Sequence, residues 1–361
     1  MRIGVPQEVK TEEYRVGLTP AAVVDLTDHG HEVFIERGAG VGAGFEDEQY
    51  RNAGASLMED AASVFEAAQL IVKVKEPQPR EVALLRPDHL LFTYLHLAAD
   101  AGLTQSLCDS GATCIAYETV TDSAGRLPLL VPMSQIAGRL SVQAGATHLE
   151  RPRGGRGVLL GGATGVPPGK VTIIGGGTVG GAAIRIALGM GANVCVLDKS
   201  MNQLEQLSQR FGSRLTTIYA SSDNLHRHVV SADLVIGAVL VPGATAARLI
   251  TADMIRSMTP GSVMVDVAVD QGGCCENTRP TTHADPTFIV DGVVHYCVAN
   301  MPGAVPATAS EALGNATLPH VLALADKGLT RALEDDEHLE NGVNIRDGKV
   351  THPAVRSSLG L

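Results

Sequence analysis

The feature that most constrains the fold is a glycine-rich segment between a strand-like run and a helix-like run. Residues 171–174 read Val-Thr-Ile-Ile, and Gly175, Gly177 and Gly180 follow in the spacing GxGxxG, before the helix-forming run 182–188. In this context Gly175 makes a tight turn, Gly177 lets the backbone approach a pyrophosphate, and Gly180 lets helix and strand pack closely. The segment therefore predicts a dinucleotide-binding unit with phosphate at the helix N-terminus.

Strand-like runs alternate with helix-length segments along most of the chain, which indicates α/β architecture with mostly parallel sheets. A chain of 361 residues is too long for one ordinary core, so we expect two domains. A helix is expected from Thr19, as N-cap, and Pro20 to about residue 28. The predicted strands are 2–5, 33–36, 70–74, 90–95 and 113–117 in a first series, and 171–174, 193–197, 215–219, 234–239, 263–267 and 294–298 in a second.

Two further helices suggest how the domains connect. Residues 134–149 have apolar positions at helical spacing and no proline, which predicts a helix bridging the domains. Residues 306–327 also favour a helix, capped by Thr308 or Ser310, that returns to the first domain. We therefore expect two Rossmann-like doubly wound domains, with a nucleotide-binding domain (134–305) inserted into a discontinuous substrate domain (1–133 and 306–361).

A carboxylate at the end of the next strand indicates which dinucleotide binds. Asp198 ends the run 193–197 and stands 18 residues after Gly180, where it can accept hydrogen bonds from both ribose hydroxyls. Its charge would repel the 2′-phosphate of NADP, and Lys199 alone is too little to reverse this. The pattern predicts NAD, the alternative being a glycine-rich turn with an acidic helix cap.

Composition narrows the class of ligand. The net charge is −11 and no basic cluster is longer than 151–153, which argues against nucleic-acid or anionic-membrane partners. Residues 171–197 are long enough to span a bilayer and contain a single charged residue, Arg185. Their seven glycines nevertheless favour a soluble strand-turn-helix. Six cysteines without a CxxC pair predict reduced thiols and no metal site, and the first ten residues do not resemble a secretory signal, so we expect a cytoplasmic location.

Two cationic positions are candidates for binding a substrate carboxylate. Arg15 lies in the loop before the helix at Pro20, where a guanidinium can clamp a carboxylate with two hydrogen bonds; the alternative is a solvated surface arginine. Lys73 and Lys75 lie in the segment 70–77, which begins with a predicted strand. Because side chains alternate along a strand, the two lysines share one face. The sequence by itself does not choose between these two lysines.

Two further residues could transfer protons. His96 closes the run 90–96 with Tyr94 on the same face, and its ordinary pKa suits proton exchange near neutrality; the alternative is a structural histidine. Asp270 follows the strand 263–267 and precedes Gln-Gly-Gly, which places a carboxylate near the expected nicotinamide position; the alternative is a turn cap. The loops 238–243, 266–273 and 298–302 follow later strands and should line the same crevice, because ligands bind at the carboxyl ends of parallel strands.

With these residues the chain closely resembles the alanine dehydrogenase family over essentially its whole length. The segments that carry the resemblance are 1–10, 15–20, 74–77, 94–96, 238–243, 270–273 and 298–303. The segment near Gln203 and residues 220–221 do not match the family clearly enough to assign adenine contacts.

The resemblance implies an NAD-dependent enzyme that reversibly converts L-alanine to pyruvate and ammonium, a homohexamer, and roles for particular residues. Catalysis would rest on His96 as acid/base and on Asp270 as a second proton-handling group, and Lys75 is chosen over Lys73. The implied substrate-binding residues are Arg15, Lys75, Tyr94, Met133 and Asn300. The implied cofactor-binding residues are Ser134, Gly175, Gly177, Thr178, Val179, Gly180, Asp198, Val239, Leu240, Val267, Ala268, Val269, Asp270, Arg279, Val298, Ala299, Asn300 and Met301.

Three other functions compete with this one. The nucleotide-binding subunit of a proton-translocating transhydrogenase shares the fold but would carry Arg-Ala-Gln after the phosphate-binding serine, whereas Ser134 is followed here by Gln-Ile-Ala. A lysine-forming relative such as saccharopine dehydrogenase would act on a different amino acid. A non-catalytic NAD sensor would lack the acid/base residues.

Overall fold

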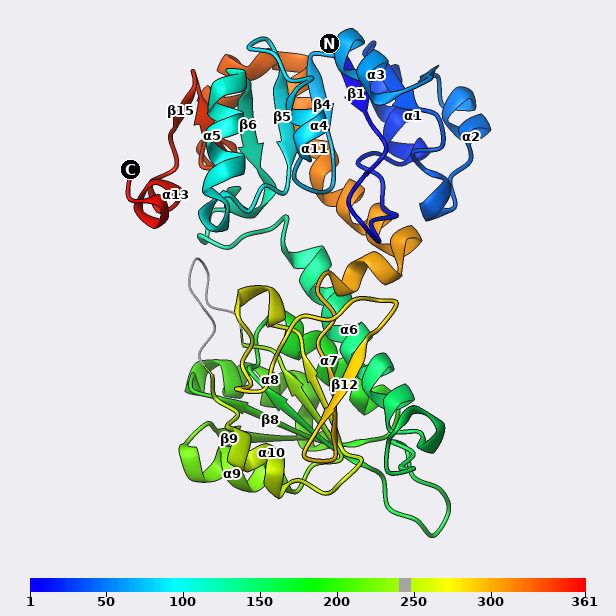
Figure 1. Cartoon of the computed structure of the whole chain (residues 1–361), viewed down its shortest axis with the longest axis vertical. Helices are drawn as coiled ribbons and strands as arrows, with labels where there is room; N and C mark the ends of the chain where they lie inside the picture. The colour runs from blue at the N-terminus through cyan, green and yellow to red at the C-terminus, as the bar shows by residue number, and fades with distance from the viewer. Residues whose placement is uncertain (240–247) are drawn as a thin grey trace. The chain divides into compact units, whose positions relative to one another are not determined.

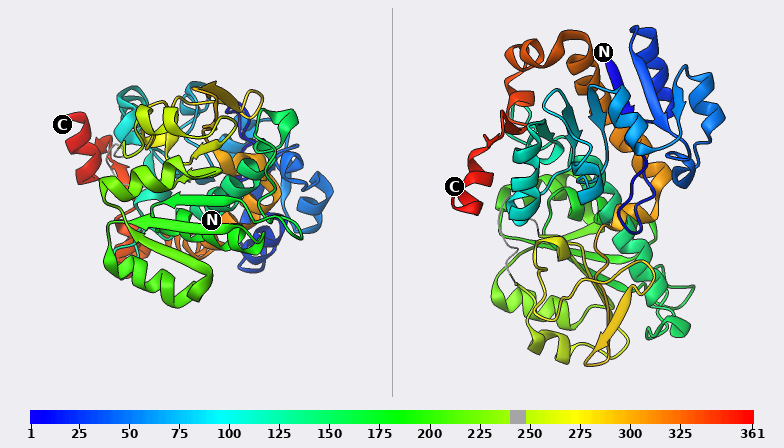
Figure 2. Two further views of the ribbon diagram at one scale, coloured as in Figure 1. Left: turned by 90° about the horizontal axis from the view of Figure 1, so that it is seen from below. Right: turned by 45° about the horizontal axis from the view of Figure 1, so that its top comes forward.

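The computed structural model describes residues 1–239 and 248–361. The chain divides into two compact units: unit 1 comprises Met1–Met133 and Gly303–Leu361, and unit 2 comprises Ser134–Pro302. Each unit has its own sheet covered by helices (Figures 1 and 2). The predicted α/β class with two doubly wound domains is confirmed.

The sheet of unit 1 has eight strands in the order β15-β14-β6-β5-β4-β1-β2-β3. All neighbours are parallel except β14, which is antiparallel to β6 and β15. The strands are β1 (Arg2–Val5), β2 (Glu32–Glu36), β3 (Ser56–Met58), β4 (Leu70–Val72), β5 (Leu90–Thr93), β6 (Thr113–Ala116), β14 (Val343–Arg346) and β15 (Lys349–Val350).

Helices cover both faces of this sheet. On one face Ile71, Leu91 and Cys114 pack into a cluster with Leu107 of α5. On the other face Phe92 lies edge-on to Tyr117, with ring centroids 4.4 Å apart. The helices of unit 1 are α1 (Pro20–Asp28), α2 (Asp47–Asn52), α3 (Ala61–Ala67), α4 (Pro79–Val82), α5 (Ala101–Ser110), α11 (Pro306–Asp335), α12 (Glu337–Glu340) and α13 (Pro353–Leu359), with 3-10 turns η1 (Val41–Ala43), η2 (Leu97–Ala99) and η3 (Tyr117–Thr119).

The predicted start of α1 is confirmed, and that of α11 is corrected. The Thr19 side chain accepts a hydrogen bond from the backbone N of Ala22 (3.3 Å) and Pro20 opens α1. By contrast, α11 begins at Pro306 with Val305 as its N-cap, so the predicted cap at Thr308 or Ser310 is wrong. Proline fits the first helical position without any capping side chain.

The sheet of unit 2 has seven strands in the order β12-β13-β11-β10-β7-β8-β9, all parallel except β12. Because β7 lies between β10 and β8, the connections leave it in both directions, which creates a topological switch point at its carboxyl end. The strands are β7 (Lys170–Ile174), β8 (Asn193–Asp198), β9 (Leu215–Tyr219), β10 (Leu234–Gly237), β11 (Val263–Asp266), β12 (Thr287–Val290) and β13 (Val293–Tyr296).

Successive residues of the central strands face opposite sides of this sheet. Ile173 and Val196 pack into a cluster with residues of α6, α7 and α8, whereas Ile174 and Leu197 pack with residues of α9 and α10. The helices are α6 (Val131–His148), α7 (Thr178–Gly189), α8 (Met201–Phe211), α9 (Ser222–Val230) and α10 (Ala252–Ser257), with 3-10 turns η4 (Arg151–Arg153), η5 (Gly212–Arg214), η6 (Val269–Gln271) and, at the boundary of the units, η7 (Met301–Ala304). Among the described residues, no helix combines the length and apolarity that a membrane span requires.

Candidate functional site

The glycine loop of unit 2 joins β7 to α7 at the switch point. Gly175 has a φ of +94°, in the left-handed region that favours glycine. A Cβ at Gly180 would lie 1.9 Å from the carbonyl oxygen of Gly175, so α7 approaches β7 as closely as predicted. A Cβ at Gly177 would meet nothing within 4 Å, and Gly177 is the N-cap of α7. The loop therefore presents backbone N–H groups to open space at a helix N-terminus, an arrangement that suits phosphate.

Asp198 ends β8 beside this loop. Its Oδ2 accepts a hydrogen bond from the backbone N of Gly176 (2.7 Å), and its Oδ1 accepts one from Ser200 N (2.8 Å). Gln203 Nε2 donates to the carbonyl oxygen of Gly176 (2.6 Å). The half-buried carboxylate is thus fixed next to the glycine loop, where a ribose following the pyrophosphate would lie.

A buried carboxylate organises the loop that carries Asp270. Asp266, the last residue of β11, accepts hydrogen bonds from the backbone N of Ala268 (3.0 Å), Cys274 (2.9 Å) and Cys275 (3.2 Å) and from Thr278 Oγ1 (2.5 Å). The loop is therefore closed around one side chain. Within it Val267 is half-buried, Ala268 and Val269 are buried, and Asp270 is exposed on η6, four residues after the strand ends.

The other proposed cofactor residues lie on α6, on α7 and on loops after strands of unit 2. Asn300 follows β13 with a left-handed φ of 60°, and its carbonyl oxygen contacts His283 Nε2 at 3.2 Å. Arg279 is exposed, and its guanidinium lies 4.4 Å from the ring centroid of Phe288. Leu240 lies outside the described residues. Buried residues are Val179, Val298 and Met301, half-buried ones are Ser134, Val239, Ala299 and Asn300, and Thr178 is exposed.

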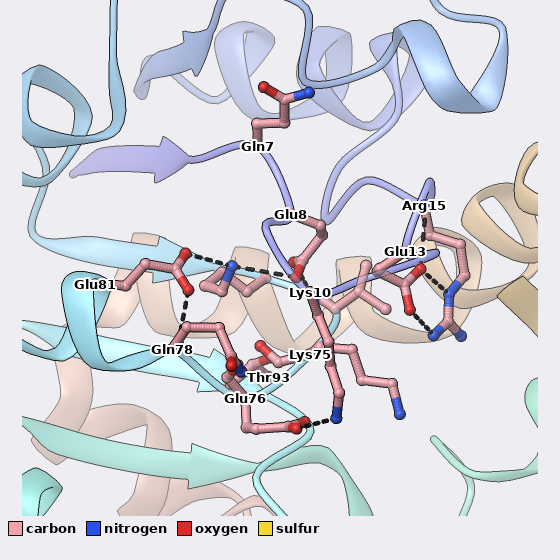
Figure 3. Close-up of polar contacts among 12 residues, drawn as sticks. Gln7, Glu8, Lys10, Glu13, Arg15, Lys75, Glu76, Gln78, Glu81 and Thr93 are labelled. Atoms are coloured by element: carbon pink, nitrogen blue, oxygen red, sulfur yellow. Dashed lines mark hydrogen bonds and ion pairs between the residues drawn. The ribbon is translucent and has the colours of Figure 1, made fainter. Parts of the chain in front are cut away.

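In unit 1, Arg15 is buried and paired with Glu13 (Figure 3). Arg15 Nε donates to Glu13 Oε1 (2.6 Å) and Nη2 donates to Oε2 (2.5 Å), which is a two-pronged ion pair. On the remaining side, Nη1 lies 3.0 Å from Met133 Sδ. Burial acts to lower the pKa of Arg15, but Glu13 outweighs burial and raises it, so the guanidinium stays charged.

The same loop is fastened to α11. Ser310 Oγ accepts a hydrogen bond from the backbone N of Val16 at 3.1 Å. The hydroxyl that was predicted to cap α11 therefore holds the residue next to Arg15 instead.

The two candidate lysines have different surroundings. Lys73 is fully buried, and its Nζ lies 3.2 Å from Glu8 and 2.7 Å from Glu81. Burial acts to lower the pKa of Lys73, but the two carboxylates outweigh it and raise the pKa. Lys75 is half-buried, its carbonyl oxygen accepts from Thr93 Oγ1 (3.0 Å), and in Figure 3 its side chain extends away from Glu8 and Glu81. The geometry therefore favours Lys75 as the lysine that meets a ligand.

Tyr94 and His96 follow β5 and stack on each other. Their ring centroids are 6.0 Å apart with an interplanar angle of 8°. Tyr94 is buried and its hydroxyl donates to the carbonyl oxygen of Leu129 (2.6 Å), and burial raises the pKa of Tyr94. His96 has a left-handed φ of 53°, and half of its side-chain surface is exposed, at 50%.

Glu118, after the neighbouring strand β6, holds this turn in place. Its carboxylate accepts hydrogen bonds from the backbone N of Leu95 (3.1 Å) and His96 (2.5 Å), and Oε1 lies 4.0 Å from His96 Nδ1. A carboxylate in this position fixes the left-handed backbone of His96 and places a negative charge near its imidazole. Tyr94 also helps to raise the pKa of Arg15, so unit 1 places Arg15 between Met133, which it contacts, and Tyr94, which stacks on His96.

Comparison with known proteins shows which family the chain belongs to. The family model described as "Alanine dehydrogenase/PNT, N-terminal domain" matches residues 4–137. The model described as "Alanine dehydrogenase/PNT, C-terminal domain" matches residues 141–353. The chain belongs to the alanine dehydrogenase/PNT family. The resemblance drawn from the sequence is therefore confirmed.

Full-length relatives agree with this assignment. The chain is 58% identical to an alanine dehydrogenase of Halomonas elongata, with 100% of this chain and 97% of that one covered. It is 51% identical to an alanine dehydrogenase of Bacillus subtilis, covering 100% and 95% of the two chains.

Two solved structures are similar to this chain over nearly its whole length. An L-alanine dehydrogenase matches with a TM-score of 0.97 at 54% identity, covering 100% of this chain and 99% of that one. A transhydrogenase of Sinorhizobium meliloti matches with a TM-score of 0.85 at 25% identity, covering 98% and 100%.

Sequence reasoning overlooked three carboxylates that hold these groups. Glu13 stands two residues before Arg15, and a two-residue spacing of opposite charges in a loop could have suggested the pair. Glu118 follows the strand next to the one that precedes His96, so their carboxyl ends meet at one sheet edge. Asp266 gave no such signal, because the three backbone N–H groups and the Thr278 hydroxyl that it binds are brought to it only when the loop folds.

Proposed function

We propose that this protein of the alanine dehydrogenase/PNT family is an NAD-dependent L-alanine dehydrogenase. In the proposed reaction L-alanine, NAD⁺ and water give pyruvate, ammonium, NADH and a proton, and the reaction is reversible. The observation that carries the proposal is the grouping of a buried, charged Arg15 with the stacked pair Tyr94 and His96 in unit 1. Full-length relatives named alanine dehydrogenase support the same substrate.

The residues of unit 2 fit a bound NAD. The Gly175–Gly180 turn leaves space for a pyrophosphate beside Gly177, and Asp198 stands where it would accept the ribose hydroxyls. The same carboxylate would repel the extra phosphate of NADP. When bound, the nicotinamide ring would accept the hydride from the alanine Cα.

Arg15 and Lys75 would bind the substrate carboxylate and the developing carbonyl. Glu13 occupies the Nε and Nη2 side of Arg15, so a carboxylate would meet the Nη1 side and replace the contact with Met133. A thioether is a weak acceptor, and a carboxylate forms a much stronger, charge-assisted hydrogen bond. Such binding positions the Cα and stabilises negative charge as the carbonyl forms.

His96 would handle the protons of the hydrolytic step. Oxidation of alanine leaves an iminium, water must add to it, and ammonia must leave, so protons move from the water to the nitrogen. The half-exposed imidazole of His96, with Glu118 beside its Nδ1, can accept and return such a proton. Asp270, exposed on η6 of unit 2, would be the second proton-handling group.

We also propose that the protein is a cytoplasmic homohexamer. The family resemblance is the support for this assembly, and the reduced thiols agree with the location: all six cysteines are free, and no disulfide forms in the described part of the chain. Light scattering on purified protein would measure the assembly, and a mass of one or two chains would refute the hexamer.

The experiment that tests the function is NAD reduction by the purified protein. L-alanine should support turnover, glycine and L-serine should support less, and L-lysine with 2-oxoglutarate and NADH should support none. His96→Ala serves as the matched inactive control, because it alters one half-exposed side chain. Binding of NADH without any L-alanine oxidation would instead favour the function of the transhydrogenase relative.

A further inference from the structure

We propose that unit 1 binds one Zn²⁺ ion between His29, His31 and Asp326. These residues come from distant parts of the chain: His29 caps the end of α1, His31 directly precedes β2, and Asp326 lies in α11. One ring nitrogen of each histidine and a carboxylate oxygen of Asp326 all lie within 4.8 Å of one another. This proposal is independent of the proposed enzyme activity and uses none of its residues.

The distances suit tetrahedral coordination. His29 Nδ1 lies 3.3 Å and His31 Nε2 lies 2.8 Å from the same oxygen, Asp326 Oδ1. Zinc binds imidazole nitrogen and carboxylate oxygen at roughly 2.0–2.2 Å, so tetrahedral ligand atoms are roughly 3.3 Å apart. The two nitrogen–oxygen pairs are at or somewhat below that separation, and the two imidazole nitrogens lie within 4.8 Å of each other.

Burial and chemistry of the ligands favour zinc over the hard cations. The His31 side chain is 7% exposed, and its Nδ1 contacts the amino nitrogen of Met1 at 3.0 Å, so Nε2 is the atom that faces Asp326. The side chains of His29 and Asp326 are 49% and 38% exposed, which leaves an entry path and room for water as a fourth ligand. Two imidazoles with one carboxylate suit Zn²⁺, whereas Mg²⁺ and Ca²⁺ prefer oxygen ligands.

The ion would fasten α11 to the end of α1 and the start of β2. Both helices belong to unit 1 (Figure 1), and they contact each other. The same helix α11 supplies Ser310, which holds the loop next to Arg15. A bound ion stabilises the folded state in proportion to the logarithm of its concentration, so zinc should raise the melting temperature of unit 1.

The test is a zinc titration of untagged, chelator-stripped full-length protein against a chromophoric zinc indicator. We expect one equivalent per chain with micromolar affinity or better in the wild type. His29→Ala and Asp326→Asn, both on partly exposed side chains, should weaken binding by about 100-fold or more, because even the loss of an outer partner costs 10–100-fold. His226→Ala, at an exposed histidine of α9, is the matched control and should bind as the wild type does.

Cobalt distinguishes this site from the cysteines. Co²⁺ bound at the proposed site should show no thiolate charge-transfer band, and zinc should raise the melting temperature of the wild type and His226→Ala but not of Asp326→Asn. A thiolate band, equal affinity in wild type and His29→Ala, or no binding up to millimolar zinc would each overturn the proposal. The last of these results would mean that hydrogen bonds alone hold the three side chains together.

Discussion

Unit 1 and unit 2 hold their functional groups by different means. In unit 2 the features proposed to bind the nucleotide are mostly backbone: a glycine turn and a helix N-terminus, with one side-chain carboxylate hydrogen-bonded to the turn. In unit 1 they are charged or polar side chains, and two of them depend on a carboxylate: the buried Glu13 pairs with Arg15, and the half-buried Glu118 holds the turn of His96. Backbone sites tolerate little added volume, whereas side-chain sites depend on charges being paired.

The largest effect should come from breaking a buried ion pair of unit 1. Lys73→Met leaves Glu8 and Glu81 buried without their cation, which should cost about 3–5 kcal/mol of unfolding free energy. Urea denaturation followed by circular dichroism would measure it. Lys75→Met is the matched control: its stability should stay within about 1 kcal/mol of the wild type while turnover with L-alanine falls. Equal stability of the two variants would contradict the assignment of Lys73 as the structural lysine.

Removing the imidazole of unit 1 should separate chemistry from nucleotide binding. His96→Ala should lower kcat by about 100-fold, or about 2.7 kcal/mol of activation free energy, because general acid/base help is worth that much. The affinity for NADH, measured by fluorescence titration, should not change, because the glycine loop belongs to unit 2. Near-normal turnover would remove His96 from its proposed role.

Added side-chain volume should damage unit 2, whereas the loss of a charge should damage unit 1. Gly180→Ala puts a Cβ 1.9 Å from the Gly175 carbonyl oxygen, so α7 must shift, at a cost of about 1–3 kcal/mol and with weaker NADH binding. Gly181→Ala, the next residue of α7, meets nothing within 4 Å and should be neutral or slightly stabilising. Similar melting curves and NADH affinities for the two variants would show that the close approach does not matter.

The smallest effect should be on cofactor choice. Asp198→Ala removes the charge that would repel a 2′-phosphate, so the preference for NAD over NADP in kcat/KM should fall by about tenfold, or about 1.4 kcal/mol. Asp223→Ala, at an exposed carboxylate of α9, controls for a change in net charge. An unchanged preference in Asp198→Ala would argue against a ribose contact.

Much of the fold followed from local pattern. Each of the eleven predicted strands begins within one residue of its observed start, because a buried parallel strand is a run of apolar residues bounded by turns. Four short strands, β3, β12, β14 and β15, were overlooked. β3 has no buried residue, β14 is interrupted by Asn344, and β15 has only two residues, so none of these three gives a clear apolar run. β12 reads Thr-Phe-Ile-Val and could have been recognised from the sequence.

Some of the candidate residues could be identified from the sequence alone, and others needed the structure. Sequence alone identified the glycine turn and Asp198, because a strand, a turn and a helix N-terminus are contiguous in the chain and each glycine has a local steric reason. The choice between Lys73 and Lys75 needed either the family resemblance or the structure. Only folding brings Glu8 and Glu81 to Lys73, Glu118 to His96, and Asp326 to His29 and His31. Burial and charge pairing between distant segments are properties of the packed molecule, and no local pattern in the chain specifies them.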